Sequence, residues 1–203
     1  MLPLKKFVPP LQLLHLKLNS LSDSDAPNSK IKHAVLYDGN ITKFDSRLHG
    51  FDIATCLEVI EHIEEEEASL FGDVVLSSFA PKILIVSTPN YEYNVILQGY
   101  TPHGQEDDPN DKNLAQACKF RNHDHKFEWT RAQFEHWASE LAAKHNYSVD
   151  FSGVGGAADV EPRFASQMAI FKRREESPGS VECVSEYKQV WKWSREEEAV
   201  GVS

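Results

Sequence analysis

The stretch FDIATCL at residues 51–57, followed directly by EVIEH at residues 58–62, decides how this sequence is interpreted. The first part is a mostly apolar run, which is typical of a strand buried on both faces of a parallel sheet. The second part places Glu58, Glu61 and His62 at positions i, i+3 and i+4. On one helical turn these side chains would converge and could bind one cation. The sequence therefore predicts a cation site at the end of a strand.

Strand-like and helical segments alternate along the chain. Apolar runs at residues 33–37 and 82–87 predict two further strands, and residues 61–79 have helical spacing. The side chains of that helix expected to face inward are Ile63, Leu70, Val74, Val75 and Phe79. This alternation predicts an α/β fold with a mainly parallel sheet, in which ligands gather at the carboxyl ends of the strands.

The last third of the chain adds a helix and two strands. Thr130 is the expected N-cap of the helix, and Gln133 stands at the capping-box position. The inner face of this helix is expected to consist of Phe134, Trp137, Ala138 and Leu141. Residues 147–151 and 164–172 are predicted to form a hairpin.

Three parts of the chain are predicted. Residues 1–29 would hold a residual short helix, at residues 11–18, and a polar loop. Residues 30–174 would form the main domain. Residues 175–203 would form a charged tail whose aromatic residues could pack or bind a partner.

The composition excludes several classes of protein. A net charge of −10 over 203 residues lacks the basic footprint of a general nucleic-acid binder, so any RNA contact is expected to be local. The three cysteines are widely spaced, which argues against a disulfide framework or a thiolate zinc site. Prolines and polar residues interrupt the leucines of residues 1–18, so secretion is not expected, and no run is long enough for a membrane span.

A resemblance to a known family rests on several segments together. The pattern Glu58-x-x-Glu61-His62, combined with FRNHDHKFEWT at residues 120–130, resembles the small-RNA 3′-terminal 2′-O-methyltransferases of the plant, Hua enhancer type. The other matching segments are YDGNITKFDSRLH at residues 37–49, IVSTPNYE at 85–92 and YSVDFSGVGG at 147–156. The likeness covers roughly residues 13–193.

The resemblance implies a Rossmann-like class I methyltransferase fold, with S-adenosylmethionine as methyl donor. It also implies a divalent metal ion held by Glu58, Glu61, His62 and His125. That ion would chelate the 2′- and 3′-hydroxyls of the last nucleotide of a small RNA duplex. Magnesium is the family expectation, whereas two imidazoles suit manganese or cobalt better. His62 or His123 would act as the general base.

Further roles are carried over by the resemblance. The residues expected near the cofactor are Asp38, Gly39, Asn40 and Leu57. Arg121 and His123 are expected to approach the terminal nucleotide or its phosphate. The partner implied is the 3′ end of microRNA or siRNA duplexes, with no membrane contact, and the location implied is the nucleus, the cytoplasm or both.

One departure from the family pattern concerns the cofactor. Such methyltransferases begin with a strand that ends in a glycine-rich turn, but no glycine precedes Gly39 here. The expectation is therefore a domain that lacks its first two strands, with marginal stability and weak cofactor binding in isolation.

Three other interpretations stay open at this point. Glu58 to His62 could be a solvated acidic helix start favoured by the helix dipole. The ExxEH pattern is also similar to the HxxEH zinc helix of metal-dependent hydrolases. Finally, the chain could be a non-catalytic remnant that keeps only the metal site.

Overall fold

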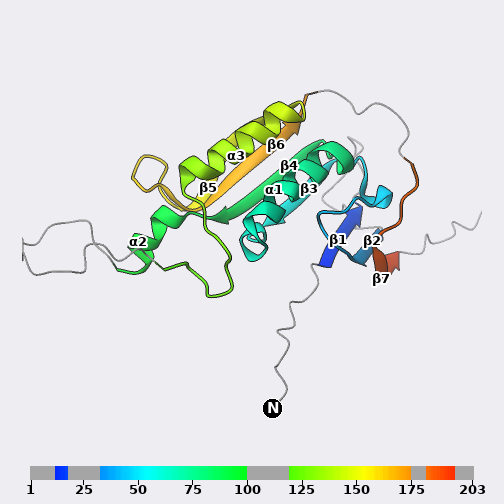
Figure 1. The fold of residues 1–203 in the computed structure, drawn as a ribbon, viewed down its shortest axis with the longest axis horizontal. Helices are drawn as coiled ribbons and strands as arrows, with labels where there is room; N and C mark the ends of the chain where they lie inside the picture. The colour runs from blue at the N-terminus through cyan, green and yellow to red at the C-terminus, as the bar shows by residue number, and fades with distance from the viewer. Residues whose placement is uncertain (1–11, 18–32, 100–118, 175–181, 195–203) are drawn as a thin grey trace, which may run out of the picture. The chain divides into compact units, whose positions relative to one another are not determined.

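A computed structural model describes four segments of the chain, which are residues 12–17, 33–99, 119–174 and 182–194 (Figure 1). The chain divides into two compact units. The first unit is made of residues 1–48 and 181–203, and the second is made of residues 49–180. Each unit is described by itself.

The second unit is built on a four-stranded sheet with the strand order β3-β4-β6-β5. Its strands are β3 (Ile53–Leu57), β4 (Ile83–Pro89), β5 (Tyr147–Gly156) and β6 (Phe164–Arg173). The pair β3–β4 is parallel, while β4–β6 and β5–β6 are antiparallel. The α/β class is thus confirmed, as is the hairpin of β5 and β6. The expectation of a mainly parallel sheet is wrong, because this sheet is mixed.

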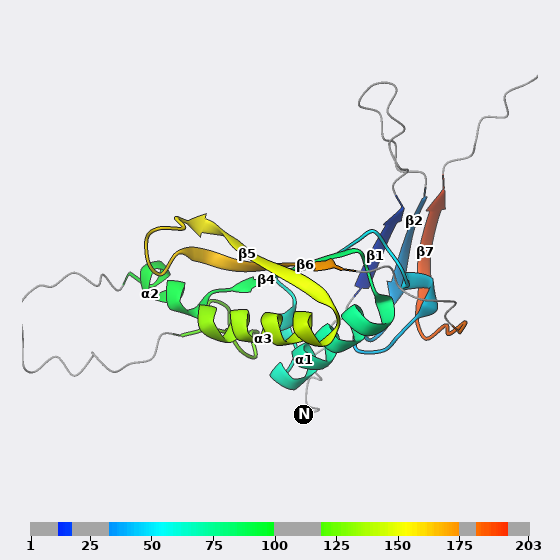
Figure 2. The same ribbon diagram turned by 90° about the horizontal axis from the view of Figure 1, so that it is seen from above.

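The two longer helices of the second unit lie along one side of this sheet (Figure 2). The longer ones are α1 (Glu65–Val74), which runs on into a π-helical turn (Val75–Phe79), and α3 (Arg131–Lys144). The short ones are the 3-10 turns Ile60–His62 and Tyr91–Tyr93, and α2 (Asn94–Leu97). Among the described residues, no helix combines the length and apolar character needed to cross a membrane.

The core of the second unit forms between α3, α1 and the sheet. The predicted inner face of α3 is confirmed, since Phe134, Trp137, Ala138 and Leu141 are all buried. In α1 the buried residues are Ala68, Phe71 and Gly72, whereas Leu70 is 49% exposed and was wrongly expected to face inward. A Cβ on Gly72 would lie 2.3 Å from Leu141 Cδ1, so this glycine permits the close approach of α1 to α3.

The first turn of α3 is stabilised by the predicted capping box. The Thr130 hydroxyl accepts a hydrogen bond from the Gln133 amide at 3.3 Å, and the Gln133 side chain accepts one from the Thr130 amide at 2.9 Å. Two amides that the helix itself cannot satisfy are thereby paired.

Replacing Thr130 with alanine is expected to lower the free energy of unfolding by about 1 kcal/mol, because the Gln133 amide loses its acceptor. Urea denaturation at neutral pH measures this difference. Thr130→Ser keeps the hydroxyl and serves as the control, and equal losses in both variants would contradict the capping role.

Strand β3 lies at an edge of its sheet. Ile53 is 58% exposed and Leu57 is 50% exposed, so the expectation of a strand buried on both faces is wrong. The segment is mostly apolar, as the sequence shows, but β4 is the only strand paired with β3 within the described part of the chain. Burial of this strand therefore depends on neighbours that local sequence does not reveal.

The first unit contains a three-stranded antiparallel sheet with the order β1-β2-β7. Its strands are β1 (Gln12–Lys17), β2 (His33–Asp38) and β7 (Lys188–Ser194), and η1 (Ser46–Leu48) is a single 3-10 turn. The helix expected at residues 11–18 is wrong, because this segment pairs as a strand with β2. Leu14 and Leu16 alternate with His15 and Lys17, a strand period that the helix interpretation overlooked.

A cluster around Tyr187 closes the turn that follows β2. The Tyr187 hydroxyl donates to the backbone oxygens of Asn40 at 2.8 Å and Lys43 at 2.9 Å. Burial alone would raise the pKa of Asp45, but hydrogen bonds from Arg47 and from the Tyr187 amide lower it to about 2. The tail thus contributes to the first unit, and these units do not follow the expected boundaries at residues 29 and 174. The assignment of residues 30–174 as the methyltransferase domain stays a prediction.

Candidate functional site

The candidate site begins where the chain leaves β3. Leu57 is paired with Ser87 of β4, and the next residue, Glu58, has a positive φ of 54°. The Glu58 amide donates to the backbone oxygen of Ser87 at 3.0 Å, and the Ser87 hydroxyl donates to the Glu58 carboxylate at 2.8 Å. Two neighbouring strand ends therefore hold Glu58 by its backbone and by its side chain.

A 3-10 turn at Ile60–His62 follows, instead of the expected α-helical turn through Glu58, Glu61 and His62. Ile60 is fully buried and anchors this turn, and Glu61 is fully buried beside it. The Thr88 hydroxyl donates to Glu61 Oε2 at 3.1 Å. Among the described residues, Glu61 Oε1 has no hydrogen-bond partner although it is buried.

The environment of Glu61 disfavours its negative charge. Burial raises the pKa of this carboxyl to about 7, and the negative charge of nearby Glu58 adds to the rise. The hydrogen bond from Thr88 acts in the opposite direction. A buried carboxyl with one unpaired oxygen and a second acid nearby is an arrangement that a bound cation would stabilise.

A second segment brings His125 to the same place. The Lys126 amide donates to the backbone oxygen of Glu61 at 2.7 Å, so the two segments are joined directly. The rings of His62 and His125 meet edge to face, with their centroids 4.8 Å apart. One ligand atom each of Glu61, His62 and His125 lies within 4.8 Å of the others.

The three residues fit a divalent ion of the first transition row. Two ligands of one such ion lie at most about 4 Å apart, since each bond is about 2 Å long, so atoms within 4.8 Å of one another are close to the spacing that an ion requires. One carboxylate and two imidazoles suit manganese, cobalt or zinc better than magnesium. The orphaned oxygen of Glu61 supplies the independent sign that a partner belongs here.

Both imidazoles are oriented by carboxylates. His125 Nδ1 lies 2.5 Å from Glu128 Oε1, and His62 Nδ1 lies 3.2 Å from Asp124 Oδ2. With Nδ1 engaged in each ring, the Nε2 atoms are the ones left for a cation.

The other predicted site residues are placed as follows. Glu58 is exposed and lies outside the three-residue cluster, although it is close enough for its charge to affect Glu61. Leu57 ends β3 and is half exposed. His123 is exposed, and its amide donates to the side chain of Asn122. Arg121 donates through its guanidinium to the backbone oxygen of Ala165 at 2.6 Å, so its described partners are structural. Their roles toward cofactor and RNA stay predictions.

Three predicted cofactor residues belong to the first unit. Asp38 ends β2, and Gly39 follows it under the ring of Tyr187, where a Cβ would meet the ring carbons at 2.4 Å. The Asn40 side chain accepts hydrogen bonds from the amide and the hydroxyl of Thr42. This turn is therefore well defined within its own unit.

Three partners of the site were missed by sequence reasoning. Thr88 contacts Glu61, Glu128 contacts His125, and Asn94 donates to Glu128 Oε2 at 2.5 Å. The spacing of His125 and Glu128 was a usable signal, because residues three apart can meet on one turn. Nothing in the sequence pointed to Asn94.

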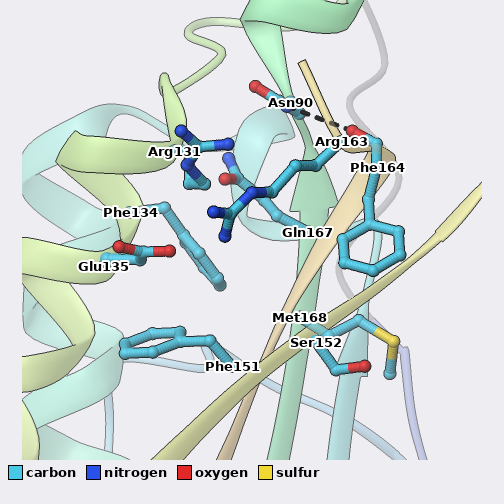
Figure 3. A pocket seen from close by; sticks show the side chains of 10 residues that line it. All are labelled: Asn90, Arg131, Phe134, Glu135, Phe151, Ser152, Arg163, Phe164, Gln167 and Met168. Atoms are coloured by element: carbon cyan, nitrogen blue, oxygen red, sulfur yellow. Dashed lines mark hydrogen bonds between the residues drawn. The ribbon is translucent and has the colours of Figure 1, made fainter. Parts of the chain in front are cut away.

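A separate pocket lies beside the N-terminal end of α3 (Figure 3). Arg131 and Arg163 both contribute to it, and both guanidinium groups pair with Glu161. Phenylalanine side chains form much of the remaining wall (Figure 3). None of the predicted site residues lines this pocket.

The α/β fold with its mixed sheet is that of a Rossmann-like class I methyltransferase. The solved structure of the small RNA methyltransferase HEN1 matches this chain with a TM-score of 0.68 and 58% sequence identity, over 82% of this chain and 18% of that one. No protein-family model matches the chain.

The chain belongs to the small RNA 2′-O-methyltransferase family. It is 59% identical over 191 residues to the Small RNA 2′-O-methyltransferase of Arabidopsis thaliana, a match over 92% of this chain and 19% of that protein. It is 40% identical over 162 residues to the protein of the same name from Xenopus tropicalis, over 76% of this chain and 39% of that protein. The chain therefore spans well under half the length of these relatives.

Proposed function

We propose that this chain takes part in S-adenosylmethionine-dependent methylation of the 2′-hydroxyl of the 3′-terminal nucleotide of small RNAs, with a divalent metal ion in the site. The observation that carries the proposal is the convergence of Glu61, His62 and His125 around an unpaired buried carboxylate oxygen. Family membership supports methyl transfer to RNA as the reaction and gives no support to a metal-dependent hydrolase.

The metal ion would be held by Glu61 Oε1 and by the Nε2 atoms of His62 and His125, with Glu58 near enough to contribute its carboxylate. When bound, the ion supplies Lewis acidity that lowers the pKa of a ribose hydroxyl and makes its oxygen a better nucleophile. The chain's own contribution is a fixed set of ligands. Thr88 and Glu128 hold the carboxylate and one imidazole in place.

The proton of the 2′-hydroxyl requires a base. A nitrogen that binds a cation has no lone pair left for a proton, and the other nitrogen of His62 faces Asp124. His123 is exposed and is not part of the ligand cluster, so it is the better candidate of the two predicted bases. Asp38, Gly39, Asn40 and Leu57 are proposed on the cofactor side, and Arg121 on the RNA side. The nucleus or the cytoplasm is the proposed location.

The test combines calorimetry with a methylation assay. Titration of the full chain with S-adenosylmethionine is carried out in the presence of Mn²⁺ and a short RNA duplex with 3′ overhangs. Transfer of a labelled methyl group to that duplex is followed in parallel. We expect methylation that depends on Mn²⁺ and is lost when the terminal 2′-hydroxyl is replaced by hydrogen. Mn²⁺ binding without cofactor binding would instead identify a non-catalytic chain that keeps the metal site.

His125→Ala is expected to weaken Mn²⁺ binding by more than the roughly 10- to 100-fold that the loss of an outer partner causes, because a direct ligand is removed. His136→Ala is the matched control, since His136 is exposed on α3 and lies outside the ligand cluster. Equal Mn²⁺ affinity of the two variants would refute the assignment of the metal site.

A further inference from the structure

Glu128 lies at the centre of a buried hydrogen-bond network. Its side chain is fully buried, and the His125 side chain beside it is only 6% exposed. Glu128 Oε1 accepts from the Arg121 amide at 2.6 Å and lies 2.5 Å from His125 Nδ1. Glu128 Oε2 accepts from the Asn94 side chain. Both carboxylate oxygens therefore act as acceptors, which compensates for the burial of this polar group.

Helix α2 supports this network from the other side. Asn94 and Gln98 are four residues apart and so share a face of the helix turn. The Gln98 side chain donates to the backbone oxygen of Lys119 at 2.7 Å and accepts from the Lys119 amide at 3.3 Å. Asn94 donates to the same backbone oxygen at 3.3 Å. The segment that carries His125 is thus attached to α2 at its start and, through Glu128, near its end.

We propose that Glu128 is a positioning residue of the metal centre, because its buried carboxylate keeps His125 in the Nδ1–H tautomer and so directs Nε2 toward the cation. Asn94 acts through Glu128 by fixing the plane of the carboxylate. The inference rests on the proposed function only in taking the partner of His125 Nε2 to be a metal ion.

The physical argument concerns which nitrogen carries the proton. A neutral imidazole has one N–H donor and one acceptor nitrogen, and a carboxylate oxygen can only accept. The contact between His125 Nδ1 and Glu128 Oε1 therefore requires the proton on Nδ1. The reverse tautomer would place two lone pairs 2.5 Å apart in a buried site, an arrangement without compensation. The acceptor nitrogen left over is the one that a metal ion needs.

The first test reads the tautomer in the metal-free wild-type chain. Long-range proton–nitrogen correlation spectra at pH 8 distinguish the two neutral tautomers of each histidine, and His125→Ala assigns the signal. We expect the Nδ1–H tautomer for His125. The Nε2–H tautomer would overturn the proposal without the need for any further variant.

The second test uses Glu128→Met, which keeps an unbranched side chain of similar length but removes both acceptors. We expect the Nδ1–H preference to be lost and the Mn²⁺ dissociation constant to rise about 10- to 100-fold. Glu140→Met makes the same substitution at an exposed position of α3 and should leave both readouts unchanged. An unchanged tautomer with Mn²⁺ affinity within about twofold of wild type would contradict the proposal.

Asn94→Ala provides a milder variant in case the buried methionine prevents folding. It leaves Glu128 and His125 in place, so the tautomer should be retained while Mn²⁺ affinity falls by less than in Glu128→Met. A larger loss of Mn²⁺ affinity for Asn94→Ala than for Glu128→Met would contradict the proposal that Asn94 acts through Glu128. If wild-type chain binds no Mn²⁺ at all, the proposed function fails, whereas the tautomer still decides the inference about Glu128.

Discussion

Replacing Glu61 with glutamine is expected to remove a pH-dependent loss of stability from the metal-free protein. The pKa of this carboxyl is raised from 4.5 to about 7 in the folded chain, chiefly by burial. The folded state therefore holds a proton that the unfolded state releases at lower pH. The stabilising contribution is fully present below pH 4.5 and is lost as the pH rises through about 7. Each pKa unit corresponds to about 1.4 kcal/mol, so wild type loses up to about 3 kcal/mol over this interval from this group.

Urea denaturation of wild type and Glu61→Gln at pH 4.5 and pH 8, with a chelator present, measures the effect. The stability of the variant relative to wild type should increase by up to about 3 kcal/mol between the two pH values. Glu66→Gln makes the same change on the exposed side of α1 and is expected to show little dependence on pH. If both variants behaved alike, the buried and unpaired state of Glu61 would be excluded.

Replacing Phe171 with alanine is expected to cost about 3–5 kcal/mol, a large share of the roughly 5–15 kcal/mol that stabilise a typical domain. Phe171 is fully buried in β6, opposite Leu84 of β4 and Val149 of β5. Its ring lies 6.3 Å from that of Trp137 in a perpendicular arrangement, so α3 and the sheet are joined at this point. A truncated side chain would leave a cavity that the surrounding strands cannot close.

Thermal and urea unfolding, followed by tryptophan fluorescence, test this expectation. Phe151→Ala removes the same atoms from the neighbouring strand β5, where the side chain is 40% exposed. Because less apolar surface is buried there, its cost should be clearly smaller than that of Phe171→Ala. Similar costs at the two positions would show that the face between α3 and the sheet is not the main core of this unit.

The parts of the fold that local signals specify were predictable. The capping box of Thr130 and Gln133 is such a case, since all of its partners lie within four residues. The buried face of α3 follows from helical spacing in the same way. The hairpin of β5 and β6 could be predicted because its strands are joined by a short turn-rich segment.

Other parts depend on contacts between distant segments and could not be predicted. The exposure of β3 is decided by which strand lies beside it, and its composition does not show this. The short leucine-rich run was expected to be a helix, but it pairs with β2 as strand β1. The 3-10 turn before α1 follows Glu58, whose positive φ coincides with a hydrogen bond from Ser87, 29 residues further on.

The candidate site could be predicted only in part, since Glu58, a predicted ligand, lies outside the cluster of Glu61, His62 and His125. Glu61, His62 and His125 were identified from spacing together with a family resemblance, and the structure brings them together. Glu128 was not identified, although its spacing from His125 was a usable signal. Asn94 was not identified because its contact with Glu128 is visible only once the chain has folded.

The Tyr187 hydroxyl, which fastens the turn after β2, also has a consequence during synthesis on the ribosome. It reaches the backbone oxygen of Asn40 across 147 residues of sequence. At translation rates of about 5–20 residues per second, roughly 7 to 30 seconds pass between the two residues leaving the catalytic centre of the ribosome. During that interval the turn after β2 lacks its hydrogen bonds from Tyr187, and β2 lacks its partner β7. Chaperones that bind exposed strand edges would therefore meet this segment before Tyr187 and β7 have been synthesised, and its final conformation is reached only after that point.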